Sequence, residues 1–245
     1  LEDDMMRLIG SDSISGILDK LGMEDDEPIE HSLVTKSIEN AQKKVEARNF
    51  SIRKHVLEYD DVMNQQREVI YAERRKILRQ EDLRGNIKDM IEKVVQRTMA
   101  MYAPPEVYSE DWDLNALINN AEDFFAPRGL LTVEYLQNLS REELDEYLHK
   151  VAEENYQQRE AASGSELMRE LDNLVMLKVV DNHWMEHLDA MDMLREGVGL
   201  RAYGQKYPLV EYKFEAYDMF EAMNEAIQDD VVRYIYHVNV ITQPQ

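Results

Sequence analysis

The 245-residue sequence contains no cysteine, only 9 glycines and 6 prolines, and far fewer basic than acidic residues. Without cysteine there can be no disulfide, no thiolate zinc site and no cysteine-ligated iron–sulfur cluster, and a reducing compartment is the default expectation. The scarcity of glycine and proline, together with 32% charged residues, favours long helices over a strand-and-turn sandwich. We therefore expect an all-α protein.

Basic residues and long apolar runs are also scarce. The net charge of -22 disfavours a nucleic-acid binder, which needs a basic face to displace counterions from phosphate. No apolar run approaches the ~18 residues that span a bilayer, and residues 1–4 (LEDD) lack the basic and apolar regions of a signal peptide. We expect a chain that is neither secreted nor membrane-spanning, and its start without an initiator Met suggests a segment of a longer protein.

The region from residue 31 to about residue 80 has no glycine or proline, and its apolar residues recur at gaps of 3, 4 or 7. They are Val34, Ile38, Ala41, Val45, Ile52, Val56, Tyr59, Met63, Ile70 and Ile77. This spacing predicts one helix roughly 75 Å long with a single apolar stripe. Such a helix needs partners along its length, so we expect Ile52, Val56, Tyr59 and Met63 to be packing positions.

Residues 81 to about 162 contain more turn signals and indicate a compact helical subdomain. These signals are Gly85, the pair Pro104 and Pro105, Pro127 and Gly129. Ser140 and Glu143 have the spacing of a capping box, in which each side chain satisfies a free amide of the other residue. A helix should follow, from about residue 141 to 159.

The last third of the sequence predicts an antiparallel hairpin of two long helices. The first runs from about residue 165 to Glu196, and helical spacing resumes from Tyr212 to Val238. The segment between Gly197 and Pro208 breaks the pattern, and we interpret its first glycine as the end of the helix. Two long helices with a brief connection form a helical hairpin.

The most enzyme-like motif is H-x-x-E-H at His183, Glu186 and His187. On a helix the two histidines share a face and could bind zinc, with the glutamate as general base of a hydrolase. The alternative is that these are polar residues on the wet side of an amphipathic helix. No third ligand is evident, so the sequence leaves a zinc hydrolase only as an alternative function.

Two further alternatives concern nucleotides and assembly. The segment from Gly197 to Ala202 imitates a dinucleotide-binding turn, but a predicted helix precedes it where a strand is required. No phosphate-binding loop is present, because no glycine is followed by lysine, and we expect no ATP site in the chain. A purely structural coiled coil would need heptads sustained over several repeats, whereas here they fade after Met63.

Three blocks of sequence resemble SecA, the family of bacterial preprotein-translocase ATPases. The first is RKHVLEYDDVMN at residues 53–64, supported by VTKSI at 34–38 and AQKKVE at 41–46. The second is YAPP at residues 102–105. The third is EHLDAMD at 186–192 with LRAYGQ at 200–205 and PLVEY at 208–212. The similarity covers essentially the whole chain in the family's order.

The resemblance implies four segments and a mechanical role. Residues 1–28 would be the end of the second motor domain, 29–82 the long scaffold helix, 83–163 the helical wing, and 164–245 the two-helix finger with the remainder of the scaffold. In this family the finger reaches into the mouth of a SecY channel. The implied contacts with channel and polypeptide are the fingertip residues Arg201, Ala202, Tyr203, Gly204, Gln205 and Lys206.

The resemblance also implies partners, cofactors and location. The partners would be a SecY-type channel, unfolded preproteins and the motor domains of the same protein, with acidic membrane lipids and a second copy as further candidates. ATP and Mg would be bound by motor domains outside this sequence, so the segment itself would hold no cofactor and catalyse no reaction. The protein would be cytoplasmic and associated peripherally with the inner face of the plasma membrane.

Overall fold

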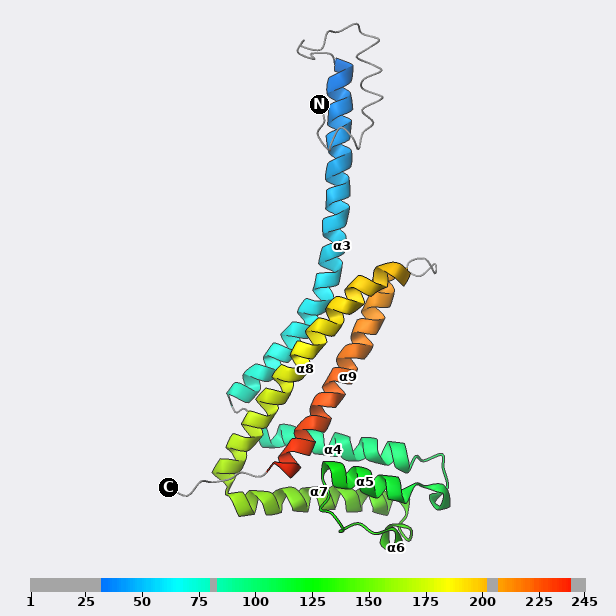
Figure 1. Ribbon diagram of the computed structural model, residues 1–245, viewed down its shortest axis with the longest axis vertical. Coiled ribbons are helices and arrows are strands. Elements are labelled where there is room, and N and C mark those ends of the chain that lie inside the picture. The colour runs from blue at the N-terminus through cyan, green and yellow to red at the C-terminus, as the bar shows by residue number, and fades with distance from the viewer. Residues whose placement is uncertain (1–31, 80–82, 202–206, 239–245) are drawn as a thin grey trace. The chain divides into compact units, whose positions relative to one another are not determined.

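A computed structural model describes residues 32–79, 83–201 and 207–238. Every regular element in these ranges is helical, which confirms the all-α prediction. The elements are α3 (Ser32–Leu78), α4 (Leu83–Tyr102), the 3-10 turn η1 (Ser109–Asp111), α5 (Leu114–Phe124), α6 (Val133–Leu136), α7 (Arg141–Ser163), α8 (Ser165–Arg201) and α9 (Pro208–His237). Figure 1 shows them in order along the chain.

The chain divides into two compact units, residues 1–61 and residues 62–245. The predicted long helix is present as α3, which begins in the first unit and ends in the second. In the second unit its Ile70 and Ile77 are buried in the main hydrophobic core, as the apolar spacing indicates. The division into residues 1–28, 29–82, 83–163 and 164–245 stays a prediction.

Helices α4, α5, α6 and α7, which we call the wing, form one part of the second unit. Ile87, Leu117, Leu144 and Leu148 are fully buried among them. The predicted capping box is present, because Ser140 Oγ accepts from the amide of Glu143 and the carboxylate of Glu143 accepts from the amide of Ser140. Gly85 is not a turn residue as expected but lies in the first turn of α4.

Helices α8 and α9, which we call the hairpin, lie side by side and make the most extensive helix contact in the second unit (Figure 1). The expectation that Gly197 ends the first helix is wrong, because α8 continues to Arg201. Val198 is buried on the inner face, so the apolar seam of the hairpin continues past the glycine and helical packing outweighs its low helix propensity. Helix α9 begins with Pro208, whose fixed φ suits a first helical position.

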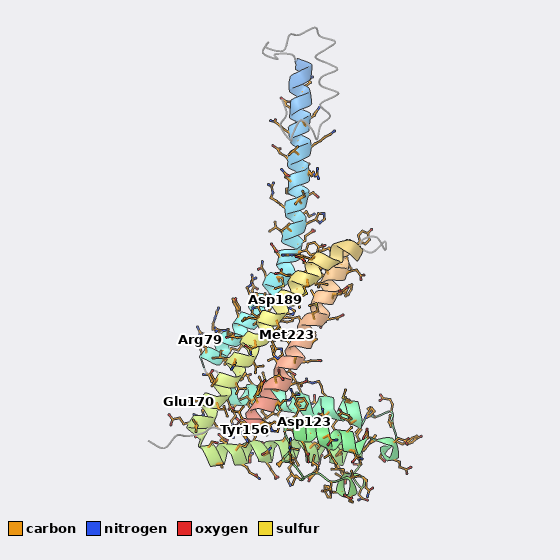
Figure 2. All side chains as sticks on the ribbon, viewed as in Figure 1. Arg79, Asp123, Tyr156, Glu170, Asp189 and Met223 are labelled. Atoms are coloured by element: carbon orange, nitrogen blue, oxygen red, sulfur yellow. The ribbon has the colours of Figure 1, made fainter. Side chains whose placement is uncertain are left out.

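A single residue, Gly164, joins α7 of the wing to α8 of the hairpin. Its φ of 86° is in the region that favours glycine, so the chain can change direction there without steric strain. Three hydrogen bonds join the helices near this corner: Tyr156 to Asp172, Tyr236 to the carbonyl of Ala152, and Arg159 to the carbonyl of Val238. In Figure 2, Tyr156 marks the corner and Asp189 and Met223 mark the middle of the hairpin.

Candidate functional site

The predicted fingertip lies at the connection between the two hairpin helices. Arg201 is the last residue of α8, and residues 202–206 lie outside the described part of the chain. The roles expected for Arg201, Ala202, Tyr203, Gly204, Gln205 and Lys206 therefore stay predictions. The structure describes α8 and α9, the two helices that this connection joins.

The outer face of α9 next to the fingertip is apolar and open. Val210, Phe214 and Tyr217 follow one another at helical spacing, and the two aromatic side chains are 67% and 62% exposed. The opposite face of the same helix is buried, through Tyr212, Ala216 and Met223. This end of the hairpin thus has one apolar stripe that packs internally and a second that is available for contact.

The hairpin is joined to α3 by a buried polar contact that involves three helices. Gln66 of α3 donates from Nε2 to the backbone carbonyl of Ala216 in α9, at 2.9 Å. Its Oε1 lies 2.9 Å from Nε2 of His187 in α8. We call these three residues, Gln66, His187 and Ala216, the three-helix junction. All three are buried, so each hydrogen bond there is protected from water.

The partners in this junction fix the orientation of the amide and the position of the imidazole proton. A backbone carbonyl can only accept, so the NH₂ group of Gln66 must face Ala216 and its oxygen must face His187. The imidazole must then donate from Nε2. Burial lowers the pKa of His187 below its usual range, which favours the neutral ring. His187 is thus a neutral donor that packs beside Trp184 and Phe220.

Three further side-chain contacts accompany the junction. Arg74 of α3 contacts Asp181 of α8 through two hydrogen bonds of 2.8 and 3.2 Å, with both side chains about half-exposed. Asp230 of α9 accepts from Arg233 on the same helix and lies 2.8 Å from Nε2 of His183. The contacts of His183 and His187 are therefore different, and each links α8 to another helix.

The two histidines of the H-x-x-E-H motif have different partners. Nε2 of His183 is directed to Asp230, Nε2 of His187 to Gln66, and Glu186 is exposed. Within the described ranges, no group of three or more His, Asp or Glu side chains is placed to hold a metal ion. The two histidines of the motif are thus engaged in separate contacts between helices.

The four residues of α3 that were expected to be packing positions have different environments. Ile52 and Val56 are each 53% exposed, whereas Tyr59 and Met63 are partly buried and Met63 packs against the main core. The helix surface around the first pair is also apolar, since Phe50 and Leu57 are exposed. A packing role for Ile52 and Val56 requires a partner in addition to the described residues and remains a proposal.

Gln66 and Arg74 were not among the expected site residues, although a signal for both is present in the sequence. The apolar stripe of α3 skips from Met63 to Ile70 and then to Ile77, and the two skipped helical positions are those of Gln66 and Arg74. A polar residue at a position of the apolar stripe indicates that its side chain has a hydrogen-bonding partner on another element. Their partners, His187, Ala216 and Asp181, are more than 100 positions away and could not be identified from spacing.

No helix in the described ranges is both long enough and apolar enough to cross a membrane.

The sequence profile of the SecA Wing and Scaffold domain matches residues 28–239. The protein translocase subunit SecA of Pelotomaculum thermopropionicum is 58% identical over the whole chain. Those of Desulforamulus reducens and Carboxydothermus hydrogenoformans are 58% and 56% identical over 98% and 100% of the chain. The chain spans 28% of the length of each of these relatives.

Proposed function

The chain belongs to the SecA family as its wing and scaffold segment, and we propose that this segment engages preprotein and a SecY-type channel and couples both to an ATP-driven motor. The observation that carries the proposal is the hairpin. Its two helices are held on α3 by the three-helix junction, and α9 carries an exposed apolar stripe near its first residue, Pro208. This arrangement suits an arm that transmits movement from the scaffold helix to its end.

The fingertip residues are proposed to contact the polypeptide and the channel. Tyr203 would present an aromatic face and a hydroxyl to a passing chain, which requires no particular sequence. Arg201 and Lys206 place positive charge on either side of it in a chain of net charge -22. Ala202, Gly204 and Gln205 are small or polar and would leave the ring accessible.

Substitution of Tyr203 in the full-length protein tests this proposal. Tyr203→Ala should abolish most preprotein transport while shifting the melting temperature by no more than about 1 °C, because the proposal requires this side chain to be exposed. Tyr203→Phe and Tyr203→Trp should retain more transport, because the ring makes the contact. Tyr207→Ala is a matched control, since Tyr207 is a highly exposed tyrosine close by. Full transport by Tyr203→Ala, or clear destabilisation, would contradict the proposal.

The wider setting follows from the family and is proposed on that basis. The segment would bind no ATP or Mg itself and catalyse no reaction, because the motor domains of the same protein would bind both. Its partners would be the channel, unfolded preproteins and those motor domains, with acidic lipids or a second copy as further candidates. The protein would be cytoplasmic and peripherally bound to the inner face of the plasma membrane.

Flotation with vesicles distinguishes these partners. The full-length protein should float with vesicles that contain reconstituted channel, and more strongly when an unfolded preprotein is present. Vesicles of acidic lipid without channel measure the lipid contribution, and vesicles of neutral lipid are the control. Equal flotation with and without channel would contradict the proposed channel contact.

A further inference from the structure

We propose that Gln66 is a positioning residue that fixes where the hairpin sits along α3, with His187 as its partner. The inference concerns the described contacts, and only its consequence for transport rests on the proposed function. One side chain of α3 holds both helices of the hairpin, because its amide donates to α9 and accepts from α8. The hairpin is thereby attached as a unit.

The attachment is specific to one position, since hydrogen bonds have a narrow range of length. Both contacts are 2.9 Å long, and a shift of about 1 Å along α3 would take one of them beyond useful range. Water cannot readily replace the lost partner at a buried site, so the group would remain unsatisfied. Intermediate positions of the hairpin are therefore disfavoured, and the junction defines a discrete position.

The Arg74–Asp181 ion pair does not have this property, although it also joins α3 to α8. Its side chains are 40% and 44% exposed, so water can solvate both charges when the pair separates. Exposed ion pairs contribute little for this reason. The two contacts lie within about two turns of each other on α3, which makes the ion pair a matched comparison for the junction.

The junction lies so far from the fingertip that a small change in the tilt of the hairpin at the junction would displace the fingertip. His187 precedes the end of α8 by about 20 Å of helix at 1.5 Å per residue. An error in position or tilt at the junction would therefore be carried to the end of the hairpin. Loss of the junction should misplace the fingertip without altering any residue there.

A distance measurement in the full-length protein tests the positioning role. Spin labels on cysteines introduced at Glu68 of α3 and Lys213 of α9, both exposed, report the position of the hairpin after native cysteines elsewhere are replaced. The parent should give one narrow distribution. Gln66→Leu should broaden or shift it by about 3 Å or more and lower transport roughly tenfold, as expected when the buried Nε2–H of His187 is left without its acceptor. Arg74→Leu should preserve the distribution and keep transport within about twofold.

A second variant tests the chemistry of the junction and remains informative if Gln66→Leu does not fold. Gln66→Glu keeps the side-chain shape but places a carboxylate against Nε2 of His187, which should raise the pKa of the imidazole. In ¹⁵N spectra of histidine-labelled protein at pH 7.5, the parent should show neutral His187 with its proton on Nε2. Gln66→Glu should show the imidazolium form persisting to at least one pH unit higher than in the parent.

The outcomes separate this inference from the proposed function. An unchanged distance distribution in Gln66→Leu, or a parent His187 with its proton on Nδ1, overturns the positioning role. A displaced hairpin with undiminished transport supports the positioning role and counts against the proposed function of the finger. A displaced hairpin with reduced transport, and neither effect in Arg74→Leu, supports both.

Discussion

Tyr156 of α7 donates its hydroxyl hydrogen to Oδ2 of Asp172 in α8, at 2.8 Å, across the corner at Gly164. Asp172 is only 2% exposed, and its other carboxylate oxygen is buried without a hydrogen-bond partner among the described residues. Burial raises the pKa of Asp172 to about 6, against a smaller opposing effect of the tyrosine hydrogen bond. Burial and the nearby carboxylate also raise the pKa of Tyr156, so its hydroxyl remains a donor at neutral pH.

The raised pKa of Asp172 predicts a pH-dependent contribution to stability. The folded state binds the proton more tightly than the unfolded state, whose carboxyl has a pKa near 3.8. The contribution is therefore favourable below about pH 4 and is lost as the pH rises to about 6. Asp172→Asn, which keeps an acceptor for Tyr156, should remove this dependence. Between pH 4 and pH 7 the variant should gain up to about 3 kcal/mol of unfolding free energy relative to the parent.

Urea unfolding of the 245-residue chain at several pH values provides the measurement. Asp181→Asn is the control, because Asp181 lies on the same helix but is about half-exposed. This variant should retain the pH dependence that Asp172 gives the parent. If parent and Asp172→Asn have parallel stability curves from pH 4 to pH 7, the carboxyl of Asp172 is not perturbed by burial.

Two glycines near opposite ends of α8 should respond oppositely to alanine. Gly164 has a φ of 86°, so Gly164→Ala should destabilise the chain by about 1 to 3 kcal/mol although its Cβ would meet no atom within 4 Å. Gly197 lies within α8 and also has open space, so Gly197→Ala should stabilise the chain by up to about 1 kcal/mol. Thermal unfolding of the two variants and the parent measures both changes in stability. Destabilisation of both by similar amounts would mean that α8 ends near Gly197.

The exposed stripe of α3 predicts a difference between the chain and the full-length protein. In the 245-residue chain, Ile52→Asp should cost less than about 1 kcal/mol because the side chain is half-exposed. Ile70→Asp would bury an unpaired carboxylate in the core and should cost about 3 to 5 kcal/mol. If the rest of the protein covers the stripe, Ile52→Asp becomes clearly destabilising there. If Ile52→Asp lowers the unfolding free energy equally little in the chain and in the full-length protein, Ile52 and Val56 do not form a packing surface.

We expect the same stripe to matter for regulation of the motor domains proposed for the whole protein. We expect the 245-residue chain to show no ATP turnover and to lower the basal ATPase of separately expressed motor domains, because the scaffold and finger would restrain them. Ile52→Asp is the matched variant, and it should inhibit less if the exposed stripe is the surface that meets the motor. Steady-state ATPase assays with increasing chain provide the measurement. No inhibition at saturation, or turnover by the purified chain alone, would contradict this prediction.

Much of the helical organisation could be predicted from local sequence signals. The absence of glycine and proline and the apolar spacing indicated α3 almost to its observed ends. The pair Ser140 and Glu143 marked the start of α7. These signals succeed because helix propensity, capping and amphipathic periodicity involve residues within about four positions of one another.

Local signals failed where packing determined the outcome. Gly85 and Gly197 were interpreted as breaks, but both lie within helices, because burial of neighbouring apolar residues outweighs the weak helix propensity of glycine. By contrast Gly164 is the one-residue corner between wing and hairpin. Whether a glycine bends the chain depended on the surrounding structure.

The sequence alone determined that this chain is helical, that its longest helix has an apolar stripe, and which family it resembles, since all three depend on residue types and their spacing. Only the tertiary structure decided that Gln66 contacts His187 and Ala216, and that Ile52 and Val56 are exposed. Hydrogen bonding and burial depend on which distant helix comes into contact. That choice results from the packing of whole apolar faces, and no short window of sequence contains it.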